Sequence, residues 1–226
     1  MARQLDLEEQ EQLDQLRHFW KQYGNAITWF LIAVLGGFAA WNGWQYWQRS
    51  QAAQASVLYD EIDRAAGAGD PVRAEQAFND IRDKFGRTTY AHQGGLMAAR
   101  VLAQKGKADA ARAALQWVAD SSGDAGLKAV ARLRLAGLQV EAKAFDDALK
   151  TLSAAFPAQF EGLAADRRGD VYNLQGKGTE AQAEYAKAWK ALDAEAEYRT
   201  LVEAKLTALG FDMQTLKPAA QPAVKS

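Results

Sequence analysis

The sequence predicts an all-α protein in which an N-terminal transmembrane helix is followed by a solenoid of helical repeats. Three observations predict this class. Only four of the 226 residues are proline, and no alternating run of β-branched residues is long enough for a sheet. A segment near the N-terminus is long, apolar and uncharged. Beyond it, small residues recur at a nearly constant spacing.

The composition argues against several classes of function. The chain carries 27 basic and 28 acidic residues, so it lacks the basic excess typical of nucleic-acid-binding proteins. It contains no cysteine, which excludes disulfides, thiolate metal sites and cysteine nucleophiles. Its two histidines, His18 and His92, are far apart in sequence, with no carboxylate cluster at ligand spacing. We therefore expect no nucleic-acid partner, no metal, no cofactor and no catalytic residue.

The apolar segment has the length and the ends of a membrane-spanning helix. No charged residue occurs between Lys21 and Arg49, and about 20 apolar residues suffice to cross roughly 30 Å of hydrocarbon. Aromatic side chains that favour the headgroup layer lie at both ends, namely Trp29 at one and Trp41, Trp44, Tyr46 and Trp47 at the other. We expect a transmembrane helix at residues 25–47, after a short tail at 1–24, so that the lipid bilayer is one partner.

Cleavage and orientation need separate arguments. Ala53-Gln54-Ala55 resembles a signal-peptidase site. However, the apolar stretch is longer than the 7–15 residues of a signal peptide and an acidic segment precedes it, which favours an uncleaved anchor.

The orientation of the predicted span depends on the basic residues that flank it. These are Arg17 and Lys21 on one side and Arg49 and Arg64 on the other. This tie leaves the orientation open.

One face of the predicted span is lined by small residues at positions i, i+3, i+7 and i+10: Ala33, Gly36, Ala40 and Gly43. Small side chains allow a second membrane helix to approach closely, so this ridge predicts helix packing. The alternative is that glycine and alanine are simply frequent in membrane helices.

The repeats are clearest in the unit that begins at Gly162. Counted as position 1 of a 34-residue tetratricopeptide (TPR) repeat, it places small residues at positions 8, 20 and 27, where paired helices cross, and large ones at 11 and 24. These residues are Gly169, Tyr172, Ala181, Tyr185 and Ala188.

Earlier units repeat the pattern. In the preceding unit, positions 7, 8, 20, 24 and 27 are Leu135, Ala136, Ala148, Leu152 and Ala155. In the unit before that one, positions 8, 11, 20, 24 and 27 are Ala99, Leu102, Ala111, Leu115 and Val118. A weaker half-unit contains Ala74 and Phe78. Three units in register predict a TPR-like domain, which we place at 48–210.

The turns agree with this division. Gly67 to Pro71, Lys105 to Lys107, Ser121 to Asp124 and Gln175 to Thr179 combine helix-stopping glycines with helix-starting residues. The last of these has no preceding strand, so a helix–helix turn is favoured over a phosphate-binding loop. Asp146-Asp147 is typical of a helix start. A closing helix is expected at 194–209, and a flexible tail at 211–226.

Three stretches together resemble one family. They are Leu16-Arg17-His18-Phe19-Trp20-Lys21-Gln22-Tyr23-Gly24 after an acidic start, Gly43-Trp44-Gln45-Tyr46-Trp47 at the end of the span, and Arg168-Gly169-Asp170-Val171-Tyr172-Asn173-Leu174-Gln175-Gly176-Lys177 in the last repeat. In this order the chain resembles the YfgM-type ancillary subunit of the bacterial Sec translocon.

The resemblance implies a location and partners. It implies a single-pass protein of the bacterial inner membrane, with a cytoplasmic N-terminus and a periplasmic TPR-like domain. The implied partners are the SecYEG translocon, a membrane-anchored periplasmic prolyl-isomerase-like chaperone and secreted client proteins, and the implied role is chaperone-like. A general cell-envelope scaffold and an anchored enzyme or signalling regulator are the alternatives. The absence of any nucleophile–base or metal constellation argues against an enzyme.

The repeat register also predicts a protein-binding face. In TPR arrays the first helix of each repeat lines the concave side, through positions 2, 5, 9 and 12. Here these positions include Leu96, Arg100, Leu133, Val140, Leu163, Asp166, Asp170 and Asn173. Such a mixture suits weak binding of extended polypeptide. The alternative is that the apolar members are buried between helices and the charged ones are merely solvated.

Overall fold

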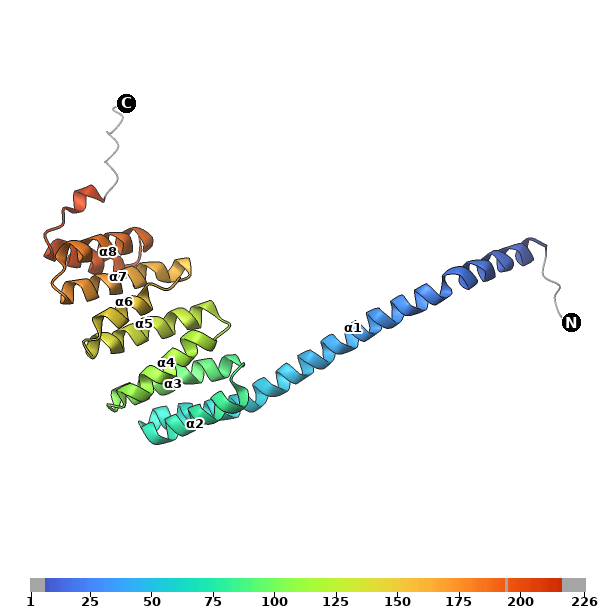
Figure 1. Ribbon diagram of the computed structural model, residues 1–226, viewed down its shortest axis with the longest axis horizontal. Helices are drawn as coiled ribbons and strands as arrows, with labels where there is room; N and C mark the ends of the chain where they lie inside the picture. The colour runs from blue at the N-terminus through green and yellow to red at the C-terminus, as the bar shows by residue number, and fades with distance from the viewer. Residues whose placement is uncertain (1–6, 194, 217–226) are drawn as a thin grey trace, which may run out of the picture. The chain divides into compact units, whose positions relative to one another are not determined.

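The computed structural model describes residues 7–193 and 195–216 (Figure 1). Within these residues the chain forms nine α-helices and one 3-10 helix, with no strand, which confirms the all-α prediction. It divides into two compact units, one up to Gln51 and one from Ala52 onwards. The first six residues of the expected N-terminal tail, Ala194 of the expected closing helix, and the expected C-terminal tail from residue 217 lie outside the described residues.

Helix α1 (Leu7–Ala68) provides the described part of the first unit up to Gln51. From Leu7 it runs without a break through the rest of the expected tail and through the expected membrane span. Large apolar side chains along it are exposed, including Phe30 at 68% and Trp41 at 63%. Among the residues described, α1 is the one helix long and apolar enough to cross a membrane. Such a surface requires an apolar environment.

Two polar side chains within residues 25–47 bond to the backbone of their own helix. The Thr28 hydroxyl donates to the carbonyl of Gly24 at 2.8 Å, and the Asn42 amide donates to the carbonyl of Phe38 at 2.9 Å. Because a polar group without a partner is costly in hydrocarbon, these bonds make both residues compatible with a membrane.

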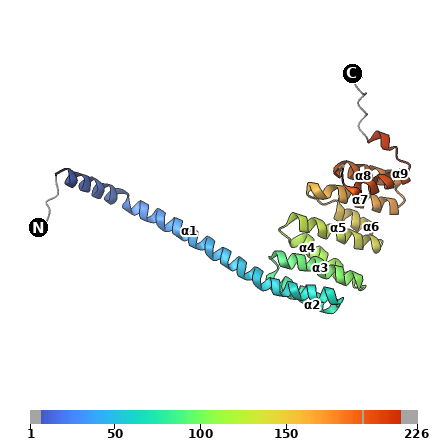
Figure 2. The same cartoon turned by 180° about the vertical axis from the view of Figure 1, so that it is seen from behind.

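The second unit is a stack of antiparallel helix pairs (Figures 1 and 2). The end of α1 from Ala52 packs with α2, and α3, α5 and α7 pair with α4, α6 and α8. Helix α9 covers the last pair and starts three residues later than the sequence predicted. The helices are α2 (Pro71–Phe85), α3 (Thr89–Gln104), α4 (Ala108–Ser121), α5 (Ala125–Glu141), α6 (Phe145–Leu152), α7 (Ala158–Leu174), α8 (Gly178–Ala191) and α9 (Glu197–Ala208), followed by the 3-10 helix η1 (Met213–Thr215).

The small residues of the repeat pattern lie where paired helices cross. Ala111, Ala148 and Ala181, all at position 20, have no exposed surface. At position 8 of the last repeat, a Cβ added to Gly169 would come within 2.5 Å of the Tyr185 ring. A larger side chain at these positions would push the helices apart. The predicted register is therefore confirmed at these crossings.

One position departs from the register. Ala155 was expected at position 27 inside a helix, but α6 ends at Leu152 and Ala155 is exposed. Its carbonyl accepts a hydrogen bond from Arg132 at 3.0 Å. Pro157 follows closely, and proline both lacks a backbone donor and disfavours helix at the residue before it. The second helix of this repeat is therefore one turn shorter than predicted.

The predicted helix ends are confirmed at three turns. Asp70 caps α2 by accepting from the backbone N–H of Val72 at 3.0 Å, and Pro71 occupies the first helical position. Asp124 caps α5 by accepting from Leu127 N–H at 2.8 Å. Gly176 follows α7 with a φ of 74°, where glycine is favoured, so this segment is a helix–helix turn. Asp146 and Asp147 lie in the first turn of α6, as predicted.

Helix α8 offers a matched test of the crossings, since Ala181 is buried and Ala183 on the same helix is exposed. We expect Ala181→Leu to reduce the free energy of unfolding by about 1–3 kcal/mol, because the added atoms have no space at the crossing. Ala183→Leu should change it by less than about 0.5 kcal/mol. Urea unfolding of the full chain in detergent, followed by circular dichroism, measures both. Equal losses would contradict the register.

Candidate protein-binding groove

Two adjoining hollows follow the first helices of the repeats. The first has a volume of about 320 Å³ and lies among α3, α4 and α5, while the second, of about 370 Å³, lies among α5, α6 and α7. Gly137 and Glu141 line both hollows, so together they form one surface, which we call the groove. The groove is lined by the same positions of three repeats, 9, 12 and 13: Arg100, Ala103, Gln104, Gly137, Val140, Glu141, Asp170, Asn173 and Leu174.

The groove contains half of the residues that the sequence predicted for the concave face. Arg100, Val140, Asp170 and Asn173 line it. The other four do not line either hollow. Leu96 is buried on α3, Leu133 packs into the core between α5, α6 and α7, Leu163 is half-buried, and Asp166 is fully buried.

Several groove residues were not predicted from the sequence. Gln104, Glu141 and Leu174 occupy position 13, which is not among the positions 2, 5, 9 and 12 that define the predicted concave face. Position 13 lies four residues after position 9 and therefore on the same helix face, so the i, i+4 rule applied to Arg100 or Asp170 would have identified it. Gly137 was overlooked because glycine has no side chain to contribute. It nevertheless matters, since a Cβ there would meet nothing within 4 Å and the groove is open at that point.

Asp166 belongs to a buried polar cluster that fixes α9 to α7. Its carboxylate accepts from Lys205 Nζ at 2.7 Å and 2.9 Å and from the Tyr198 hydroxyl at 2.5 Å. Lys205 also donates to Asp170 at 2.7 Å, and the Tyr185 hydroxyl donates to Asp170 at 2.8 Å. The expectation that Asp166 faces a partner is therefore corrected, because a carboxylate on this side of α7 is required to bind the closing helix.

The hydroxyl groups of Tyr185 and Tyr198 stay protonated and can therefore donate within this cluster. Burial raises the pKa of the Tyr198 hydroxyl well above its ordinary value, and the hydrogen bond to Asp166 raises it further. Burial and the bond to Asp170 do the same for the pKa of Tyr185. Both tyrosines therefore keep their protons and remain donors to the carboxylates at neutral pH.

A second network joins three helices through Arg168. Its guanidinium donates to the carbonyl of Leu152 at the end of α6, to Glu184 on α8 at 2.7 Å and to Glu161 on α7 at 3.1 Å. Burial alone would raise the pKa of Glu184, but the hydrogen bonds from Lys187 and Arg168 outweigh it and lower that pKa. Arg168 and Gly169, part of the stretch that carries the family resemblance, thus have structural roles.

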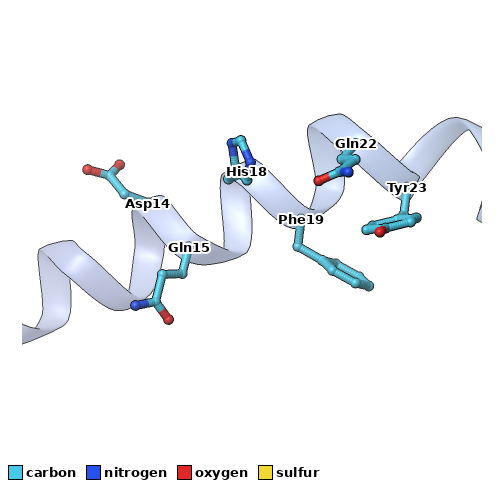
Figure 3. Close-up of a pocket in the computed structure, with 6 residues that line it drawn as sticks. All are labelled: Asp14, Gln15, His18, Phe19, Gln22 and Tyr23. Atoms are coloured by element: carbon cyan, nitrogen blue, oxygen red, sulfur yellow. The ribbon is translucent and has the colours of Figure 1, made fainter.

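The remaining candidates offer no enclosed site. The hollow around His18 on α1 is formed by residues of a single helix and is open to the surroundings (Figure 3). His92 is buried against the Trp117 ring, with 5.1 Å between ring centroids. Burial lowers its pKa, which keeps it neutral in the core. Over the described ranges, no three histidine or carboxylate side chains are placed to hold a metal ion.

Comparison with known proteins agrees with this architecture. A family model described as a tetratricopeptide repeat-like domain matches residues 17–211, which include the apolar part of α1. The chain is therefore a TPR-like repeat protein that also contains a helix long and apolar enough to cross a membrane.

Curated relatives define the family more closely. A protein of Escherichia coli (strain K12) is 32% identical over 186 residues, covering 81% of this chain and 86% of the relative. A protein of Neisseria gonorrhoeae is 29% identical over 204 residues, covering 90% and 98%, and one of Haemophilus influenzae is 28% identical over 182 residues, covering 80% and 89%. All three are named ancillary SecYEG translocon subunit. The chain belongs to this family, which confirms the resemblance drawn from the sequence.

The buried cluster predicts a large effect of removing one charge. Lys205→Met leaves Asp166, with no exposed surface, without its cation. We expect the free energy of unfolding to fall by about 3 kcal/mol, near the lower end for a broken buried pair because Lys205 is itself 23% exposed.

Lys187→Met is the matched control, because Lys187 is 64% exposed and its partner Glu184 keeps Arg168. It should cost less than about 1 kcal/mol. Urea unfolding measures both variants in the full chain. A loss for Lys205→Met no larger than the control would show that the cluster does not hold α9.

Proposed function

We propose that the chain is a single-pass ancillary subunit of the SecYEG translocon, with its TPR-like domain in the periplasm. In this proposal residues 1–24 are cytoplasmic, residues 25–47 cross the inner membrane without being cleaved, and residues 48–226 lie in the periplasm. The groove binds secreted polypeptides as they leave the channel. It passes them to a membrane-anchored periplasmic chaperone related to prolyl isomerases, and no catalytic step is involved.

The observation that carries this proposal is the agreement of family and architecture. Relatives named as SecYEG subunits match this chain over 80% or more of its length, and the TPR-like family model spans both the apolar helix and the repeats. An apolar helix supplies attachment at the membrane, where the channel lies. A groove open along three repeats suits an extended polypeptide better than a small molecule, which usually requires a deeper and more enclosed cavity.

The small-residue ridge of α1 supports attachment to another membrane helix. Ala33, Gly36, Ala40 and Gly43 lie on a helix, and a Cβ added at either glycine would meet nothing within 4 Å. The ridge is thus open to close approach, where dispersion contacts between helices accumulate. We propose that a membrane helix of the channel packs against it.

Co-purification from detergent-solubilised bacterial membranes tests the assignment. We expect the tagged full chain to recover SecYEG subunits, and the double variant Gly36→Leu/Gly43→Leu to recover several-fold less, because two leucines hold the partner helix away. Val34→Leu is the matched control, since Val34 is exposed and is not three or four residues from any ridge residue, which places it on another face. It should leave recovery unchanged.

Two outcomes would count against the proposal. Recovery of outer-membrane assembly factors without any SecYEG subunit would favour a general cell-envelope scaffold instead. Undiminished recovery by the double variant would keep the translocon assignment but remove the ridge from the contact.

A further inference from the structure

The first hollow of the groove contains two arginines without a counter-ion. Arg100 on α3 is exposed, and within the described ranges neither it nor Arg134 on α5 forms an ion pair. Arg134 Nη1 donates to the carbonyl of Leu96 at 3.2 Å, one helical turn before Arg100. That bond brings the guanidinium of Arg134 beside the face of α3 that carries Arg100. It uses only one of the five N–H donors of Arg134.

Within the described residues, the acidic side chains that line the groove form no ion pair with these two arginines. Glu141 lines both hollows but follows Arg134 by seven residues, about 10 Å along α5. In the second hollow, Arg167 pairs with Asp170 at 3.5 Å, and Asp170 also accepts from Lys205. Charge is therefore distributed unevenly along the groove, with excess positive charge at the α3 end and the negative charge of Glu141 near the middle.

The floor between these charges is apolar. Ala99, Ala103 and Leu115 form it in the first hollow, while Gly137 and Val140 continue it into the second. Apolar side chains of a bound segment can contact this floor, and an anion beside it can accept charge-assisted hydrogen bonds from the exposed Arg100 and Arg134.

We propose that the groove selects extended polypeptide segments in which an acidic side chain binds between Arg100 and Arg134 and apolar residues follow over Gly137. This proposal rests on the proposed function and names the class of segment that the same groove takes. A carboxylate matches the planar guanidinium fork. Glu141 disfavours a second acidic residue farther along, so the acidic group also sets the direction in which the segment lies.

Fluorescence anisotropy on the full chain in lipid nanodiscs tests this. The probe is a fluorescein-labelled Gly-Ala-Val-Asp-Ala-Val-Gly peptide with a blocked C-terminus, compared with peptides that carry Asn or Lys in place of Asp. We expect the Asp peptide to bind about tenfold more tightly than the Asn peptide, as for a charge-assisted hydrogen bond, and the Lys peptide to bind most weakly.

Charge reversal in the protein sharpens the test. Arg100→Glu should invert the order, so that the Lys peptide binds more tightly than the Asp peptide, while Arg100→Gln should only abolish the preference. Arg87→Glu is the matched control, because Arg87 is exposed between α2 and α3 and does not line the groove. It should keep the preference of the natural chain. Circular dichroism verifies that each variant is folded.

The outcomes separate this inference from the function on which it rests. Equal affinities for the Asp, Asn and Lys peptides, or a preference that Arg100→Glu leaves unchanged, would overturn acidic recognition while leaving a groove that binds polypeptide. Failure of all three peptides to bind would overturn both acidic recognition and the proposed role of the groove.

Discussion

The fold depends on close approach between paired helices at positions that tolerate only small side chains. The Tyr185 ring would be 2.5 Å from a Cβ at Gly169, and Val118 would be 2.7 Å from a Cβ at Gly95. Such contacts let large residues such as Tyr185 fill the space between neighbouring helices instead of separating them. Because each crossing fixes one pair and each pair stacks on the next, the first helices of three repeats align and form the groove between them.

Polar interactions between helices add to the packing at the crossings. Arg168 on α7 joins the end of α6 to α8, and the cluster around Lys205 holds α9 over the last pair. Because of these contacts, the residues of α7 have two different roles. Asp166 and Gly169 serve the packing, Asn173 and Leu174 face the groove, and Asp170 contributes to both because it accepts from Lys205 and lines the second hollow.

The sequence predicted the helical class, the apolar helix and most crossings because these depend on local periodicity and residue size. The prediction failed at positions whose environment depends on a contact with a residue far away in the sequence. Asp166 looks like an exposed acidic residue until Lys205, 39 residues later, pairs with it. Counted with Ala74 at position 20, Ile62 on α1 occupies position 8, where the later repeats have alanine or glycine. Gly94 on α3 makes room for its larger side chain, which would lie 2.8 Å from a Cβ added at Gly94. Lys143 adopts a φ of 60° where the other repeats have glycine, so this turn carried no sequence signal.

Site-specific crosslinking during secretion tests most directly whether the groove binds polypeptide. A photoreactive amino acid replaces Gln104 in the groove or Ala183 on the exposed side of α8, in the full chain beside SecYEG engaged with a stalled secreted protein. If the groove binds polypeptide, residue 104 crosslinks to the part of that protein that has emerged into the periplasm, and residue 183 does not. Absence of a crosslink from residue 104, or equal crosslinks from both positions, would contradict it.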